Sequence, residues 1–122
     1  MLSFKETNLK LLFFSVNSTV REENGLAKSS RNELLSVNSK NEATLIYKCL
    51  NYCLNNKEKG VRALKLYIQD QFKKQDNIEL EYAEITSLKN LLPISKWEAE
   101  NENAICIGAY IDSVRLIDNI IL

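Results

Sequence analysis

Hydrophobic residues recur every three to four positions in two neighbouring stretches of the chain, a spacing typical of amphipathic helices. The first stretch follows Ser36, a suitable N-cap, and predicts a helix over residues 37–55. Gly60 interrupts the pattern, and a second helix is predicted over residues 61–74. The predicted inner faces are Ala43, Ile46, Tyr47, Leu50, Cys53 and Leu54 for the first helix, and Val61, Leu64, Ile68 and Phe72 for the second.

From residue 77 onward the hydrophobic period changes to two. Residues 78–85 alternate and predict a half-buried strand in which Ile78, Leu80 and Tyr82 share one face. Two further apolar stretches, 104–111 and 114–121, are separated only by Asp112 and Ser113, and they predict a β-hairpin. Residues 86–102 are predicted to be a connector with a short helical turn at 87–90. The pattern indicates an α+β fold, a three-stranded antiparallel sheet with helices packed on one face.

The first quarter of the chain has a different character. Residues 8–16 are apolar and rich in aromatic side chains, and they predict a buried strand over 9–16, at the edge of the sheet or at an interface with another domain. Residues 17–31 are polar, contain Gly25 and follow neither period. They predict a long loop, and long loops in compact domains often carry function.

Length and charge narrow the class of protein. The 122 residues suit a single domain spanning 1–122. Sixteen basic and sixteen acidic residues give a formal net charge of zero, which argues against a nucleic-acid-binding domain. The apolar runs are far shorter than the roughly 20 residues of a membrane span, and the start lacks the pattern of a secretory signal. A cytoplasmic protein with neither nucleic acid nor membrane as partner is therefore expected.

The chain contains no histidine and three cysteines. Without histidine it cannot itself supply a Ser-His or Cys-His nucleophile, a histidine-containing zinc site or imidazole acid–base catalysis. Cys49 and Cys53 would share one helical face, where they could hold a metal, but Cys106 is distant in sequence. The three cysteines predict buried structural thiols rather than a disulfide framework, and no metal site is predicted.

One stretch of the loop carries candidate chemistry. Lys28 and Arg31 are cationic donors, Ser29 and Ser30 are hydroxyl donors, and backbone amides lie among them. Phosphate groups are bound by such convergent N–H and O–H donors with positive charge close by. The same run is common in ordinary solvated loops, so these residues alone leave both interpretations open.

The sequence motif around this stretch resembles that of a known family. The pattern R-E-x-x-G-L-A-x-S-S-R-N at residues 21–32, followed by L-S at 35–36, is similar to V-R-E-x-D-G-L-A-M-S-S-R-N-x-Y-L-S. The latter motif is the usual sequence in the C-terminal domain of the pantothenate synthetases (pantoate–β-alanine ligases). The segments E-Y-x-E-I at 81–85, L-P-I at 92–94 and V-R-L-I-D-N at 114–119 also fit the family. The matching segments occur in the same order as in the family and together cover residues 9–122.

The resemblance implies an ATP-dependent ligase of coenzyme A biosynthesis. Such an enzyme joins pantoate to ATP with Mg²⁺, forming pantoyl adenylate, and β-alanine then displaces AMP to give pantothenate. The family's ATP contacts fall on Val20, Lys28, Ser29, Ser30 and Arg31, and no catalytic residue falls in this chain. Lys28 stands where the family usually has methionine or leucine, so a phosphate contact of its side chain is an inference from charge.

The resemblance also implies a missing half. The family's Rossmann-like N-terminal domain, with its H-x-G-H motif, its pantoate-binding glutamines and most of its homodimer contacts, has no counterpart in these 122 residues. The chain is therefore expected to be an ATP-closing domain that needs an N-terminal synthetase domain as partner and is inactive alone. The alternative is a non-catalytic interaction or regulatory module that retained the loop by descent.

Overall fold

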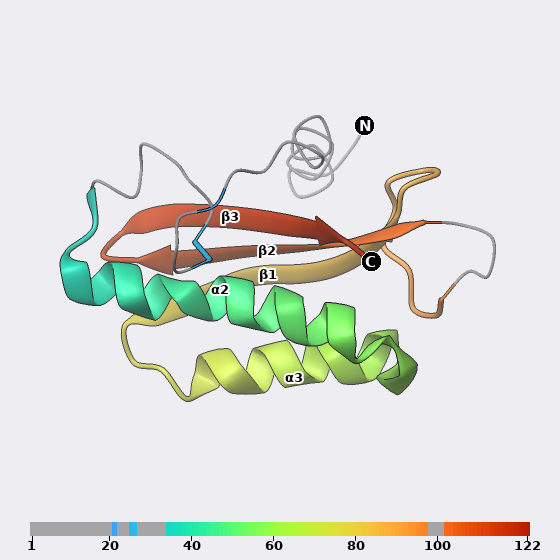
Figure 1. The fold of residues 1–122 in the computed structure, drawn as a ribbon, viewed down its shortest axis with the longest axis horizontal. Coiled ribbons are helices and arrows are strands. Elements are labelled where there is room, and N and C mark those ends of the chain that lie inside the picture. Colours follow the sequence, from blue (N-terminus) through green and yellow to red (C-terminus); the bar gives the residue numbers. More distant parts are fainter. Residues whose placement is uncertain (1–20, 22–24, 27–33, 98–101) are drawn as a thin grey trace.

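The described part of the chain forms a two-layer structure of two α-helices and three strands (Figure 1). The computed structural model describes residues 21, 25–26, 34–97 and 102–122. In chain order its elements are α2 (Val37–Asn55), the 3₁₀ turn η3 (Lys57–Lys59), α3 (Val61–Lys73), β1 (Ile78–Ser87), β2 (Asn103–Ile111) and β3 (Val114–Ile121). The strands are antiparallel in the order β1-β2-β3, and both helices lie on one face of the sheet. The predicted fold class is confirmed. The strand predicted over 9–16 lies outside the described residues.

The hydrophobic core lies between the helices and the sheet. Its fully buried side chains include Ile46, Leu50, Leu64, Ile68, Ile85, Ile105 and Ile107. The four residues predicted to face inward from the second helix are all buried, and its Tyr67 ring stacks on Tyr52 of α2 with centroids 3.6 Å apart. No helix in the described part of the chain is long and apolar enough to cross a membrane.

One margin of α2 differs from the sequence prediction. Leu54, predicted to face inward, is 37% exposed, and the buried stripe instead runs through Cys49 and Leu50. Tyr47 lies seven residues before Leu54 and therefore on the same side of the helix, where it is half-buried. The apolar pattern is thus wider than the surface that the sheet covers, and its margin is left for other contacts.

A β-bulge changes the faces of β1. The register between β1 and β2 shifts between Leu80 and Tyr82, so that Glu81 has no partner in the register. Beyond the bulge Ala83 and Ile85 join the core, and Tyr82 turns to the face away from the helices. The prediction that Tyr82 shares a face with Ile78 and Leu80 is therefore wrong. A Cβ atom at Gly108 would come within 2.5 Å of the Tyr82 ring, so the ring occupies the space that the glycine leaves.

The β2–β3 hairpin forms as predicted. Ile111 pairs with Val114, and the two residues between them, Asp112 and Ser113, have φ of 52° and 64°. Two positive φ values in a two-residue loop match the twist of antiparallel strands. The connector also begins with the predicted turn, which the Leu91 amide closes by donating to the Ser87 carbonyl over 2.8 Å. β1 itself continues to Ser87, two residues further than predicted.

Candidate functional site

The candidate site is defined by the two flanks of the predicted phosphate-binding loop. Val20, Lys28, Ser29, Ser30 and Arg31 lie outside the described residues. The structure does describe three residues before Lys28, namely Arg21, Gly25 and Leu26, and the chain from Leu34 after it. We call the three described residues Arg21, Gly25 and Leu26 the leading flank, and residues 34–36 the trailing flank.

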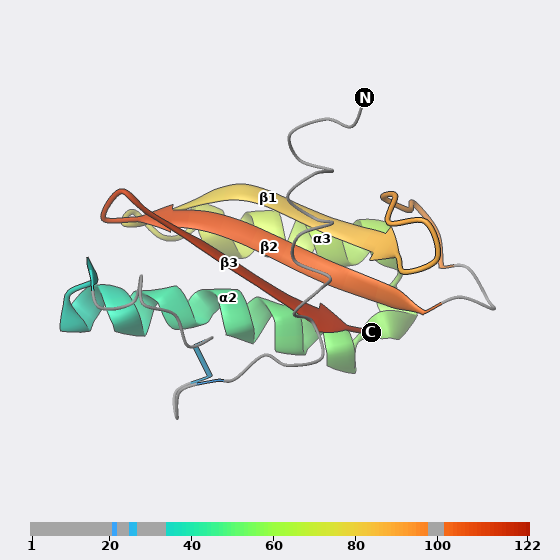
Figure 2. The same cartoon turned by 90° about the horizontal axis from the view of Figure 1, so that it is seen from above.

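Arg21 attaches the leading flank to the edge strand. Its guanidinium donates two hydrogen bonds to the Asp118 carboxylate on β3, over 2.5 and 3.1 Å. It also donates to the carbonyl oxygens of Gly25, over 3.2 Å, and Asn119, over 3.3 Å. The guanidinium carbon lies 4.5 Å from the centroid of the Tyr47 ring on α2, a cation–π distance. Figure 2 shows residues 21 and 25–26, in blue, on the side of α2 away from α3.

Gly25 and Leu26 fit this place for two different reasons. Gly25 has φ of +92°, and a Cβ atom there would lie 2.8 Å from the Tyr47 ring. Backbone conformation and lack of space both favour glycine at this position. The side chain of Leu26 is 4% exposed and belongs to the core. The leading flank is therefore held by an ion pair, a close backbone approach and a buried side chain.

The trailing flank is attached to the same hairpin. Leu35 is buried, and the Ser36 hydroxyl caps α2 by accepting from the Ser39 amide over 3.1 Å. The Ser39 hydroxyl accepts from Ser36 over 3.0 Å and donates to the Asp112 carboxylate at the β2–β3 turn. Carboxylates of one hairpin therefore hold both flanks. Asp118 binds the leading flank through Arg21, and Asp112 binds the trailing flank through Ser39.

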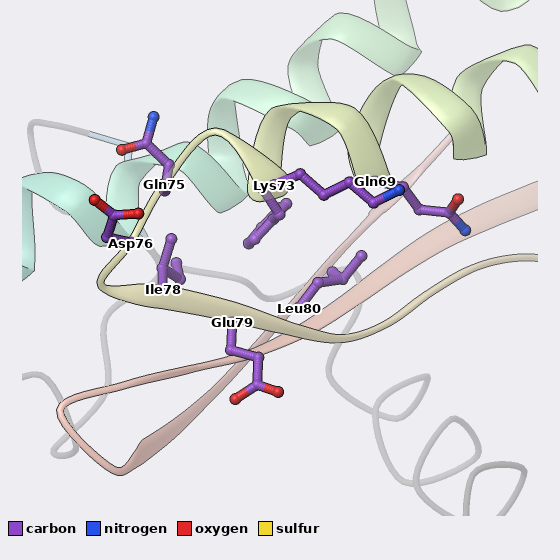
Figure 3. A pocket seen from close by; sticks show the side chains of 8 residues that line it. Gln69, Lys73, Gln75, Asp76, Ile78, Glu79 and Leu80 are labelled. Carbon is purple, nitrogen blue, oxygen red and sulfur yellow. The ribbon is translucent and has the colours of Figure 1, made fainter.

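A separate hollow of about 500 Å³ lies between the end of α3 and the start of β1 (Figure 3). Apolar residues from both elements line it, together with Lys73 and two carboxylates, Asp76 and Glu79. It lies on the α3 side of the layer, whereas the leading flank lies on the other side of α2. Its mixed charge does not suit a triphosphate, which needs a surplus of positive charge and N–H donors.

The cysteines are buried thiols, as predicted. Cys49, Cys53 and Cys106 are free and at most 1% exposed. Burial raises the pKa of each thiol to about 12, and for Cys49 the neighbouring Cys53 adds to the effect. In the described part of the chain, no group of three or more His, Cys, Asp or Glu side chains is placed to hold a metal ion.

These pKa shifts predict unreactive cysteines. The thiolate is the reactive form, and at a pKa near 12 about one thiol in ten thousand is ionised at pH 8. Ellman's reagent should therefore detect no thiol in the folded chain at pH 8 and all three after unfolding in guanidinium chloride. A thiol that reacts in the folded chain as fast as free cysteine would contradict the burial of these side chains.

Comparison with known proteins decides the family. A family model described as pantoate–β-alanine ligase matches residues 4–121. The chain belongs to the pantoate–β-alanine ligase family. The match includes both flanks and the residues between them, and it confirms the resemblance recognised in the sequence.

Relatives with this name are considerably longer than the chain. The pantothenate synthetase of Christiangramia forsetii is 39% identical over 106 residues, covering 84% of this chain and 37% of that protein. The bifunctional pantoate ligase/cytidylate kinase of Synechocystis is 37% identical, covering 86% of this chain and 21% of that protein. The crystal structure of pantothenate synthetase from Thermus thermophilus superposes with a TM-score of 0.72 at 30% identity, covering 84% of this chain and 37% of that one. The chain thus spans well under half the length of the relatives that it matches.

Several residues of the site were not predicted from the sequence. Asp118 appeared only as one letter of the V-R-L-I-D-N segment, and Tyr47 only as part of a core-facing stripe. The roles of Ser39 and Asp112 had no local signal, since each depends on a partner 73 positions away in the sequence. A charged residue inside an otherwise apolar strand was the one available hint for Asp118, because a buried carboxylate needs a partner.

Proposed function

We propose that this chain is the part of a pantoate–β-alanine ligase that closes over the phosphates of ATP. Val20 lies near the nucleotide in this proposal, and Lys28, Ser29, Ser30 and Arg31 donate to the phosphate oxygens. ATP with its Mg²⁺, pantoate and β-alanine are the substrates. The observation that carries the proposal is the family match, whose span of residues 4–121 includes these five residues.

The geometry of the leading flank supports this assignment of charges. Arg21 is the first cation of the motif, but its guanidinium is engaged by Asp118 and by two carbonyl oxygens. The positive charge that neutralises a triphosphate bound beside this flank must therefore come from other residues. Lys28 and Arg31 are the next cations along the chain. Arg31 offers a planar fork that can bind two oxygens of one phosphate, whereas Lys28 contributes a single charged donor.

The proposed chemistry has two steps. In the first, a carboxylate oxygen of pantoate bonds to the α-phosphorus, the bond to the bridging oxygen breaks, and pyrophosphate leaves. In the second, the β-alanine amine bonds to the acyl carbon of pantoyl adenylate, AMP leaves with the bonding electron pair, and the amine loses a proton. Donors from this chain would stabilise the negative charge that develops on the phosphate oxygens in the first step.

The remaining groups of the reaction must come from another part of the enzyme. The chain has no histidine, and it spans only 37% of the synthetases named above from Christiangramia forsetii and Thermus thermophilus. We propose that an N-terminal domain of the family binds pantoate and completes the active site. This chain together with such a domain, as separate polypeptides or as a fusion, is called the assembled ligase below.

The chain on its own should make no detectable pantothenate. The test is an assay of AMP and pantothenate formation from pantoate, β-alanine and ATP, in a preparation free of host synthetase. Addition of the N-terminal domain should restore both products. AMP formation by the chain alone, dependent on both other substrates, would contradict the proposed division of the site. An assembled ligase without activity would instead favour a non-catalytic interaction module.

A further inference from the structure

We infer that Asp118 and Asp112 are positioning residues for the phosphate-binding loop, acting through Arg21 and Ser39. The two carboxylates belong to one hairpin, and between them they hold both flanks of the loop. This inference rests on the proposed function, because it assigns the hairpin a role in ATP binding and not only in folding. Neither carboxylate touches the nucleotide in this arrangement.

Arg21 holds the leading flank through several contacts at once. Its guanidinium donates to the Asp118 carboxylate and the Asn119 carbonyl on β3, and to the Gly25 carbonyl within the flank. It also lies over the Tyr47 ring of α2. The Asp118 side chain is 5% exposed and that of Arg21 is 21% exposed, so water screens the pair only weakly. A bidentate arginine–carboxylate pair fixes orientation as well as distance. The backbone carbonyl of Gly25, three residues before Lys28, is thereby fixed relative to the sheet.

The trailing flank is fixed by a shorter chain of contacts. Asp112 accepts from the Ser39 hydroxyl, which in turn accepts from Ser36, the N-cap of α2. Asp112 and its neighbour Ser113 are held in the left-handed region by the tight turn. These two hydrogen bonds join the start of α2 to the tip of the hairpin.

Attachment of both flanks to one hairpin affects the entropy of phosphate binding. Seven residues, 27–33, join the two flanks. Fixing the two ends of a segment lowers the conformational entropy that remains to be lost when its donors converge on a phosphate. Release of either end should therefore weaken ATP binding specifically, even where the rest of the fold persists.

The sheet offers a matched control for this idea. Arg115 and Glu81 form another bidentate pair, over 2.7 and 3.0 Å, with side chains 22% and 21% exposed. Arg115 alternates with the core residues Val114 and Leu116, so this pair lies on the face of the sheet away from α2 and Arg21. Loss of the Glu81 charge removes an ion pair of similar geometry without touching either flank.

The experiment compares Asp118→Asn, Asp112→Asn and Arg21→Lys with Glu81→Gln in the assembled ligase. The two aspartate variants should raise KM for ATP, with kcat/KM for ATP lowered about 10- to 100-fold, the scale of a misplaced binding group. KM for pantoate and for β-alanine should stay unchanged. Glu81→Gln should leave all three KM values unchanged. Amide hydrogen exchange of the 122-residue chain should accelerate at Arg21, Gly25 and Leu26 in Asp118→Asn, while α3 and β1 keep their protection.

Arg21→Lys separates positioning from charge neutralisation. Lysine still places a positive charge beside Asp118, but one ammonium cannot bond to the carboxylate and both carbonyl oxygens in the fork geometry. The variant should therefore unfold near the wild-type urea midpoint and still show the raised KM for ATP. A wild-type KM for ATP in Arg21→Lys and Asp118→Asn would overturn the inference, as would an equal effect of Glu81→Gln. If Arg31→Ala, assayed in parallel, retains wild-type kinetics, the proposed function itself fails.

Discussion

Replacement of Arg31 by alanine in the assembled ligase is expected to lower kcat/KM for ATP by about 2–4 kcal/mol in free-energy terms, the usual effect of removing a donor to developing charge. A guanidinium can bind two oxygens of a phosphate at once. Arg21 and Arg31 are the two arginines of the motif at residues 21–32, and Arg21 is already engaged by Asp118. Steady-state kinetics with ATP as the varied substrate measures the effect. The folded state should be unaffected, and its urea midpoint serves as the control.

The neighbouring side chains provide a graded comparison. Ser29→Ala and Ser30→Ala should each cost about 1 kcal/mol, because each removes a neutral hydrogen bond. Lys28→Met should cost least, since methionine is usual at this position in the family. An Arg31→Ala variant with unchanged kcat/KM would show that residues 28–31 form an ordinary surface loop in this protein.

Leu50→Ala should destabilise the isolated chain by about 2–5 kcal/mol, the range for a large-to-small change in a packed core. The Leu50 side chain is fully buried between α2 and the sheet, so its removal leaves a cavity that the surrounding isoleucines cannot fill without moving. Urea unfolding followed by circular dichroism gives the free energy of unfolding. The slope of the transition should stay the same as in the wild type.

Leu54→Ala is the matched control for this variant. It removes the same atoms one helical turn later, from a side chain that is 37% exposed, and surface substitutions of this kind usually change stability by about 0.5 kcal/mol or less. The hydrophobic pattern alone places both leucines on one inner face and predicts similar losses. Equal destabilisation by the two variants would therefore support the sequence pattern against the structure.

Local regularities in the sequence were enough to predict most of the fold. The helix bounds 37–55 follow from the Ser36 cap and an apolar repeat, because both depend on residues three to four positions apart. The hairpin follows from two turn residues between two apolar runs. The family, and with it the interpretation of Lys28–Arg31, also depended on a contiguous motif. The helix and hairpin signals are visible in the sequence because the contacts that they encode are local.

The contacts that hold the site were decided by tertiary structure alone. Arg21 and Asp118 are 97 positions apart, and no local pattern shows that a loop arginine meets the carboxylate of the last strand. The bulge at Glu81, which reverses the faces of Tyr82 and Ala83, is likewise invisible in a regular alternation. The half-exposed margin of α2 carries Tyr47 as well as Leu54, and it is set by how far the sheet extends over the helix. In each case the deciding energy comes from the packing of elements distant in sequence, whereas periodicity reports only what each element prefers on its own.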